Sequence, residues 1–125
     1  MTSFRIMSTA LSDTKPSAVE PELSAFQQTI LAILSEEARY GLAIKRELET
    51  YYDSEVNHGR LYPNLDDLVT MGLVEKSELD KRTNEYALTE DGHDALLAQL
   101  SWVCSRFVTT ESRAETLHDL VADAN

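Results

Sequence analysis

Apolar residues recur every three or four positions along three stretches of the chain, which is the spacing of one buried helix face. The first helix is expected from about Glu22 and the second from about Tyr40 to near Asp53. The third should follow Asn57, whose side chain can cap its first turn, and should end at Gly72. The apolar stripes are, in order, Phe26, Ile30, Ile33 and Leu34; Ile44, Leu48 and Tyr51; and Leu61, Leu65, Leu68 and Val69.

Two short strand-like runs follow, from Leu73 to Leu79 and from Asn84 to Leu88. The residues between them, Asp80 to Thr83, suit a hairpin turn. Thr89 can then cap a long helix. Three helices and a hairpin in this order predict an α+β, mainly helical fold, the winged helix-turn-helix, with the hairpin as its wing.

The long helix after Thr89 carries apolar residues on more than one face, which exceeds what covering a small domain from one side requires. A shorter C-terminal helix adds to this apolar area. The simplest use of the surplus is a twofold dimer interface, so we predict a long C-terminal dimerisation helix. The residues predicted to form the interface are Leu96, Leu100, Trp102, Val103, Phe107, Leu117, Leu120 and Val121.

At 125 residues the chain is long enough for one domain but too short for two. We expect residues 1–20 to be a flexible arm, residues 21–89 the winged helix-turn-helix and residues 90–125 the dimerisation helices. No apolar run approaches the roughly 20 residues that cross a bilayer, which predicts a cytoplasmic protein with no membrane partner. The lone Cys104 suits a reducing compartment.

The charge is the opposite of the usual basic footprint of a DNA-binding protein, since 22 acidic and 11 basic residues give a formal net charge of −11. Two interpretations are open: an acidic surface that binds a partner, or adaptation to very high salt. The carboxylates are spread along the chain, which favours high salt. At 1 M salt the screening length is about 3 Å, so local contacts would decide DNA binding.

In a helix-turn-helix, the start of the third helix lies nearest the bases of the major groove. Arginine pairs well with guanine and asparagine with adenine, so Arg60 and Asn64 are the best candidates for base contacts. Asn57 and His58 are also nominated, and Gly59 would permit close approach of the backbone. The alternative is that Asn57 only caps the helix and the others form a solvated face.

Further DNA contacts are expected from the wing and from the second helix. The basic pair in the hairpin turn is well placed for phosphate or the minor groove, although such pairs are usually only solvated. Tyr40 is equally compatible with the core. The candidates are Lys81, Arg82 and Thr83 on the wing, Arg39, Tyr40, Lys45 and Arg46 around the start of the second helix, and Tyr62 through its hydroxyl group.

The sequence offers little support for catalysis or a metal. The three histidines, His58, His93 and His118, show no ligand spacing, and there is no phosphate-binding loop or nucleophile motif. Cys104 beside Trp102 is compatible with a redox sensor but is more typical of a small packed residue. We therefore expect no enzyme activity and no required cofactor, with weakly bound monovalent cations left open.

Three blocks of the sequence resemble the PadR family of winged-helix transcription regulators. They are LAILSEEARYGLAIKREL, GRLYPNLDDLVTMGLVEK and NEYALTEDGHDAL, within about Gln28 to Leu100. The second contains the family's "LYP" of the recognition helix, and the third matches its "YxLTxxG" element with Tyr86, Leu88, Thr89 and Gly92. This resemblance implies that Arg60, Tyr62 and Asn64 lie at the DNA face and that the helix after Thr89 dimerises.

The chain departs from most of that family in its acidity and in its short C-terminal part. Acidity combined with these motifs resembles haloarchaeal PadR-like regulators and implies a role in reactive-oxygen stress. We therefore predict a homodimeric transcription regulator that binds a pseudo-palindromic site in double-stranded DNA. The alternative is a winged helix that binds another protein, in which the wing cations are incidental.

Overall fold

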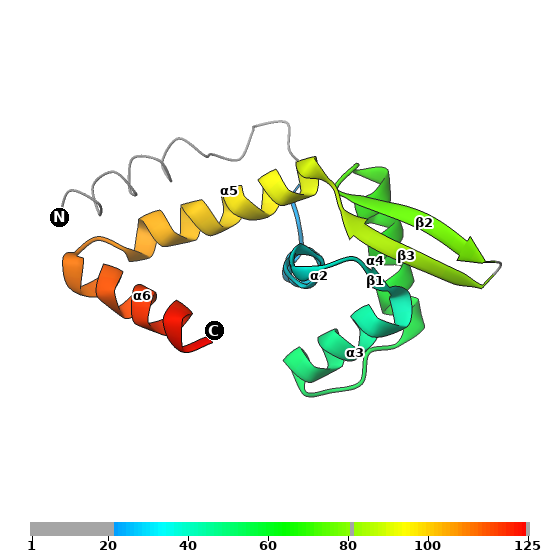
Figure 1. Cartoon of the computed structure of the whole chain (residues 1–125), viewed down its shortest axis with the longest axis horizontal. Coiled ribbons are helices and arrows are strands. Elements are labelled where there is room, and N and C mark those ends of the chain that lie inside the picture. The colour runs from blue at the N-terminus through cyan, green and yellow to red at the C-terminus, as the bar shows by residue number, and fades with distance from the viewer. Residues whose placement is uncertain (1–21, 81, 125) are drawn as a thin grey trace. The chain divides into compact units, whose positions relative to one another are not determined.

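The computed structural model describes residues 22–80 and 82–124 (Figure 1). The described residues fall into two units, a winged-helix unit that ends at Leu96 and a C-terminal unit that begins at Leu97. The long helix α5 (Glu90–Phe107) passes through this boundary. The N-terminal arm predicted from the sequence lies outside the described residues.

Three helices enclose the core of the winged-helix unit: α2 (Ala25–Glu36), α3 (Gly41–Tyr52) and α4 (His58–Thr70). Helix α2 begins after Ser24 rather than near Glu22, because Ser24 and Gln27 form a reciprocal capping box with two hydrogen bonds of 3.1 Å. Most residues of the three predicted apolar stripes are buried in the structure. The buried helix residues are Phe26, Ile30, Leu31, Ile33, Leu34, Ile44, Leu48, Leu61, Leu65 and Leu68.

Tyr51 is an exception. The sequence predicts it on the buried face of α3, but it is 69% exposed in the structure. Tyr52 takes that place: it is half-buried against the core and its ring stacks on Phe26, with centroids 6.0 Å apart. The buried face of α3 runs through Ile44, Leu48 and Tyr52, and Tyr51 falls beyond its edge.

The sheet has three antiparallel strands in the order β1-β3-β2. They are β1 (Arg39–Tyr40), β2 (Val74–Asp80) and β3 (Thr83–Leu88). The β2–β3 hairpin confirms the predicted wing. Strand β1 was absent from the prediction, because two residues carry no strand pattern of their own and this pair becomes a strand only by pairing with β3.

The centre of the sheet is Tyr86 of β3, whose side chain is fully buried. It pairs with Arg39 of β1 on one side and with Lys76 of β2 on the other. Near the end of the hairpin, the register shifts between Glu78 and Asp80, which forms a β-bulge.

The residues at the start of α5 contact those that follow α4 through hydrogen bonds and close backbone packing. Gly72 has a φ of 79°, and the next amide, of Leu73, donates back to the carbonyl of Leu68 at 3.0 Å. The Thr89 hydroxyl donates to the Gly72 carbonyl at 2.7 Å and accepts from the Gly92 amide at 3.0 Å. A Cβ on Gly92 would overlap the carbonyl oxygen of Leu73, so this close approach requires glycine.

In the C-terminal unit, α5 is followed by the predicted shorter helix, α6 (Glu111–Ala124). The Thr110 hydroxyl accepts from the Arg113 amide at 3.2 Å and caps α6. The Arg113 guanidinium donates to the Phe107 carbonyl at 3.2 Å and lies 5.2 Å from the Phe107 ring centroid. This one side chain therefore joins the end of α5 to the start of α6. None of the described helices has the length and apolar character of a membrane span.

Candidate nucleic-acid interface

The first turn of α4 is held by contacts on both flanks. Asn57 caps the helix as predicted, since its Oδ1 accepts from the Arg60 amide at 2.8 Å. The His58 ring stacks on Tyr62, with centroids 5.5 Å apart and ring planes 1° from parallel. Tyr62 in turn covers Gly41, where a Cβ would lie 2.7 Å from its hydroxyl oxygen. Tyr62 is therefore half-buried and serves the packing of α4 against α3, besides any role of its hydroxyl group at DNA.

The two residues nominated to read bases are both engaged within the chain. The Arg60 guanidinium lies 4.0 Å from the Phe26 ring centroid and 5.7 Å from that of Tyr52. The Asn64 amide nitrogen donates to the Arg60 carbonyl at 2.7 Å. Because this nitrogen carries two hydrogens, one donates to the Arg60 carbonyl while the other is left for a base, so the bond orients Asn64 without excluding an adenine contact.

The exposed residues of α4 include three that the sequence nominated, His58, Gly59 and Arg60, and others that it did not. Opposite the buried leucines of the helix, the exposed residues are Gly59, Pro63, Asp66, Asp67 and Thr70. Asp66 and Asp67 therefore stand on this face, although neither was predicted from the sequence to contact DNA. Their position opposite Leu61, Leu65 and Leu68 in the helical repeat could have predicted that they face outward. A carboxylate can accept from the amino group of cytosine or hold a cation beside phosphate.

Arg39 is not a free cation. Its guanidinium lies 3.7 Å from carboxylate oxygens of Glu36 and Glu37 and 3.5 Å from one of Glu47. Its side chain is only 16% exposed. We therefore revise its predicted role from DNA contact to a tie between α2, β1 and α3.

The other candidates around α3 divide into engaged and available groups. Lys45 pairs with Glu49 at 3.5 Å and is half-buried, so its charge is largely committed. Arg46 is exposed, and no ion pair to it is found among the described residues. Tyr40 is 46% exposed at the start of α3, which argues against the core position left open for it. Arg46 and Tyr40 therefore remain available for contacts.

The wing keeps its exposed arginine. Arg82 is exposed, and its backbone amide donates to Asp80 Oδ1 at 2.8 Å, which fixes the turn. This bond, with a second from the Thr83 hydroxyl, holds the pKa of Asp80 below its ordinary value. Leu79, within the bulge, is 55% exposed and was not nominated. Lys81 lies outside the described residues.

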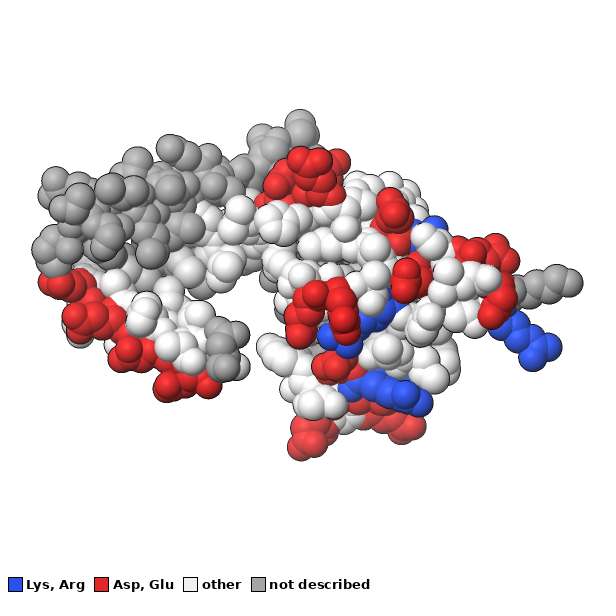
Figure 2. Space-filling view, in the orientation of Figure 1, with Lys and Arg blue, Asp and Glu red and all other residues white. Residues whose placement is uncertain are grey.

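Basic side chains form small separate patches on the visible face, over α3 and at the end of the hairpin, among more numerous acidic ones (Figure 2). A row of carboxylates follows α6, where Glu111, Glu115 and Asp119 are exposed at four-residue intervals. On this face, DNA contacts would therefore depend on individual cations rather than on a broad basic surface.

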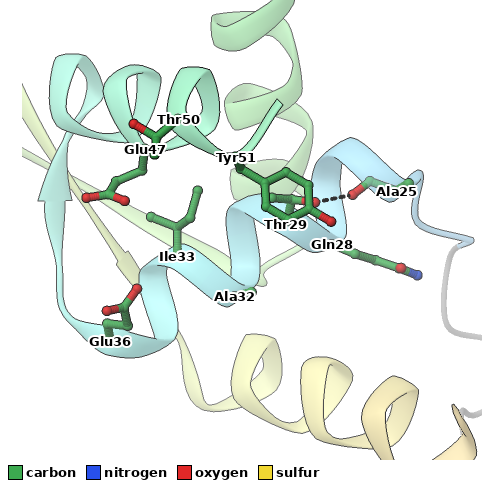
Figure 3. A pocket seen from close by; sticks show the side chains of 9 residues that line it. All are labelled: Ala25, Gln28, Thr29, Ala32, Ile33, Glu36, Glu47, Thr50 and Tyr51. Atoms are coloured by element: carbon green, nitrogen blue, oxygen red, sulfur yellow. Dashed lines mark hydrogen bonds between the residues drawn. The ribbon is translucent and has the colours of Figure 1, made fainter. Parts of the chain in front are cut away.

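A groove of about 550 Å³ lies between α2 and α3 (Figure 3). Small and apolar residues line much of it, among them Ala25, Ala32 and Ile33, with Glu36 and Glu47 at one end.

Among the described residues, no group of three or more His, Cys, Asp and Glu side chains could hold a metal ion.

The predicted dimer residues are mostly exposed. Leu96 differs, because it packs against the core of its own chain, and we assign it an intrachain role. Leu117 is half-buried on α6. The exposed members of the set are Leu100, Trp102, Val103, Phe107, Leu120 and Val121, and Leu97 joins them on α5.

The fold, the capped α4 and the wing match a known family. Residues 30–98 match the sequence model of a protein family described as "Transcriptional regulator PadR-like family". The chain belongs to this family. PadR-like proteins are DNA-binding transcription regulators and not enzymes, so the predicted class of function is confirmed.

Solved structures agree with this assignment. RosR of H. salinarum is 67% identical, with a TM-score of 0.80 over 82% of this chain and 94% of that one. A structure described as the complex hsRosR-S1 is 68% identical, with a TM-score of 0.79 over 82% of this chain and 91% of that one. F93 from STIV, described as a winged-helix DNA-binding protein, is 17% identical with a TM-score of 0.53 over 69% and 89% of the two chains, a likeness of fold alone. Comparison with curated protein sequences gave no match.

Proposed function

We propose that this PadR-like regulator binds a pseudo-palindromic operator as a homodimer. Each protomer would place the start of α4 in a major groove and its wing on the flanking backbone or minor groove. The observation that carries the proposal is the combination of an exposed wing arginine, Arg82, with a capped and exposed start of α4 in a PadR-like fold. The 67% identity to RosR supports a shared fold.

The homodimer is supported by the apolar residues that α5 and α6 leave uncovered. Trp102 is 51% exposed and Leu120 is 67% exposed. Large apolar side chains in such numbers on two successive helices are typical of an interface between subunits. A twofold dimer would also match the symmetry of a pseudo-palindromic site.

We further propose that DNA binding takes place in high salt and recruits cations. Asp66 and Asp67 stand on the outward face of α4, so each would approach DNA phosphates as a like charge. A cation held between carboxylate and phosphate removes this repulsion. Binding that takes up cations opposes the usual release of counterions, so affinity should stay flat or rise over part of the high-salt range.

A salt titration tests this part of the proposal. A fluorescent duplex, selected by the protein from a random-sequence pool, is titrated with protein at increasing KCl concentrations. We expect a flat or rising affinity, and Asp66→Asn with Asp67→Asn should restore a decline with salt. A steep decline for the wild-type protein would exclude cation recruitment but not DNA binding.

We extend the proposal to reactive-oxygen stress, the role that the sequence resemblance implies. A map of genome occupancy before and after peroxide treatment tests it. Occupancy should change at promoters of oxidant-defence genes. Unchanged occupancy everywhere would remove this role and leave the regulator without an assigned signal.

A protein-binding winged helix is the competing function, favoured by the groove between α2 and α3. Replacement of the wing cation separates the two. Arg82→Ala should weaken duplex binding by about tenfold if it contacts phosphate, because charge-assisted hydrogen bonds are strong. Unchanged duplex affinity would remove Arg82 from the DNA interface, whereas no duplex selected by the wild-type protein would favour the protein-binding function.

A further inference from the structure

We infer that Phe26 and Tyr52 form an aromatic seat that positions Arg60 for contact with duplex DNA. The aromatic seat is the pair of stacked rings that Phe26, in the first turn of α2, and Tyr52, in the last turn of α3, present to the guanidinium. The inference rests on the proposed function and adds two positioning residues to it. Neither ring needs to touch DNA.

The geometry of a guanidinium allows one group to make both contacts. An aromatic ring attracts the flat face of the guanidinium, whereas its N–H groups donate in the plane of the group. Stacking on Phe26 at 4.0 Å therefore occupies one face and leaves the donor edge. A phosphate or a guanine approaching that edge would meet an arginine whose orientation is already set.

The backbone beneath Arg60 is fixed as well. Its amide donates to the Asn57 side chain at 2.8 Å, and its carbonyl accepts from the Asn64 side chain at 2.7 Å. The turn before α4 is held by Glu49, whose carboxylate accepts from the Val56 amide at 3.0 Å. The side chain and its backbone are thus both ordered before any ligand arrives, which reduces the entropy lost on binding.

Burial shows why the seat lies where it does. Phe26 is only 4% exposed, and the Arg60 side chain covers its outer face. Tyr52 is half-buried and packs against the same core. The seat therefore belongs to the rigid core of the winged-helix unit, so it can resist the pull of a DNA phosphate better than a solvated side chain could.

A double-mutant cycle on duplex affinity tests the inference. The probe is a fluorescent duplex selected by the wild-type full-length protein from a random-sequence pool. Tyr52→Leu should weaken binding about fivefold, the range expected for loss of a cation–π contact. In an Arg60→Ala background, the same change should have no effect, because the side chain that the seat positions is gone. Phe26→Leu serves as a second variant, with folding checked by circular dichroism.

Tyr51→Leu is the matched control, since Tyr51 neighbours Tyr52 edge-on at 4.9 Å but is 69% exposed and is not one of the two rings of the aromatic seat. It should leave duplex affinity unchanged. NMR shifts of the Arg60 side-chain protons should move upfield in the wild type and relax in Phe26→Leu and Tyr52→Leu. An equal loss of affinity in both backgrounds, or tighter binding by Tyr52→Leu, would overturn the inference. Failure of the wild type to select any duplex would instead overturn the proposed function.

Discussion

Gly92 lies where the first turn of α5 meets the backbone of Leu73. A Cβ there would overlap the Leu73 carbonyl oxygen and approach the Leu88 side chain at 2.7 Å. Because backbone cannot move aside as a flexible side chain can, Gly92→Ala should lower the free energy of unfolding by about 2 kcal/mol or more. Urea denaturation followed by circular dichroism measures this change.

His93→Ala is the control for this prediction, because His93 is the next residue of the same helix and its side chain is 65% exposed. A surface substitution of this kind should change the free energy of unfolding by less than about 0.5 kcal/mol. Equal stability of the Gly92 and His93 variants would contradict the close approach described for α5.

Asn57 gives a second prediction for a single residue. Its side-chain oxygen caps α4 through the Arg60 amide, so Asn57→Ala should lower the free energy of unfolding by about 1 kcal/mol. Asn57→Asp keeps an acceptor at the cap and should retain most of the stability. If both variants were equally unstable in urea, the cap would not be the source of the loss.

The turn between α3 and α4 gives a prediction at the scale of elements. The Val56 amide donates to Glu49 at 3.0 Å, and this bond, with the nearby Lys45, lowers the pKa of Glu49 from its ordinary value of 4.5. A carboxyl group with a lowered pKa in the folded state stabilises the fold above its ordinary pKa. This stability should be lost as the pH falls through the lowered pKa.

Glu49→Gln removes the titrating group and keeps an oxygen that can accept from Val56. Wild-type stability in urea should exceed that of the variant near pH 7, and the difference should shrink as the pH falls below 4.5. A difference that is constant across this pH range would show that Glu49 acts through packing rather than through its charge.

The elements with their own periodic pattern were predictable from sequence. The helices α2 to α6 and the hairpin satisfy local rules of spacing, capping and turn chemistry, so their prediction needed no distant partner. Strand β1 lacked such a pattern because Arg39 and Tyr40 form a strand only through Tyr86 and Glu85. Its pairing residues lie too far along the chain for a local rule to find.

The candidate site was less predictable for the same physical reason. The sequence nominated Arg60, but its ring partner Phe26 comes from another helix and could not be read from spacing. The ion pair of Arg39 with Glu36 could be expected from their closeness in sequence, whereas its ion pair with Glu47 depends on how α3 packs. The sequence showed which residue types suit DNA contact. It did not show which basic side chains already contact other residues of the chain.

At the scale of the whole molecule, the proposed homodimer can be tested by placing charge on its apolar helices. Leu100 is 54% exposed on α5 and Leu120 is 67% exposed on α6. Leu100→Glu with Leu120→Glu should convert dimer to monomer, because a buried carboxylate without a partner is strongly unfavourable. Sedimentation velocity in concentrated KCl measures the change.

His118→Glu is the matched control, because its side chain is 82% exposed on the same α6 helix. It should leave the sedimentation coefficient unchanged. A monomeric wild-type protein, or a double variant that stays dimeric, would refute the proposed interface.

The bulge in β2 has a consequence at the high salt concentrations that we propose for this protein. With the order β1-β3-β2, one side of β2 is open, and such an edge invites lateral pairing with another copy. The charged side chains of β2, which are Glu75, Lys76, Glu78 and Asp80, normally discourage this, but at 1 M salt charges are screened within about 3 Å. The β-bulge at Leu79 disrupts the row of backbone hydrogen-bonding groups along this edge, and salt does not change that backbone geometry. Resistance to edge-to-edge pairing should therefore depend more on the bulge than on charge.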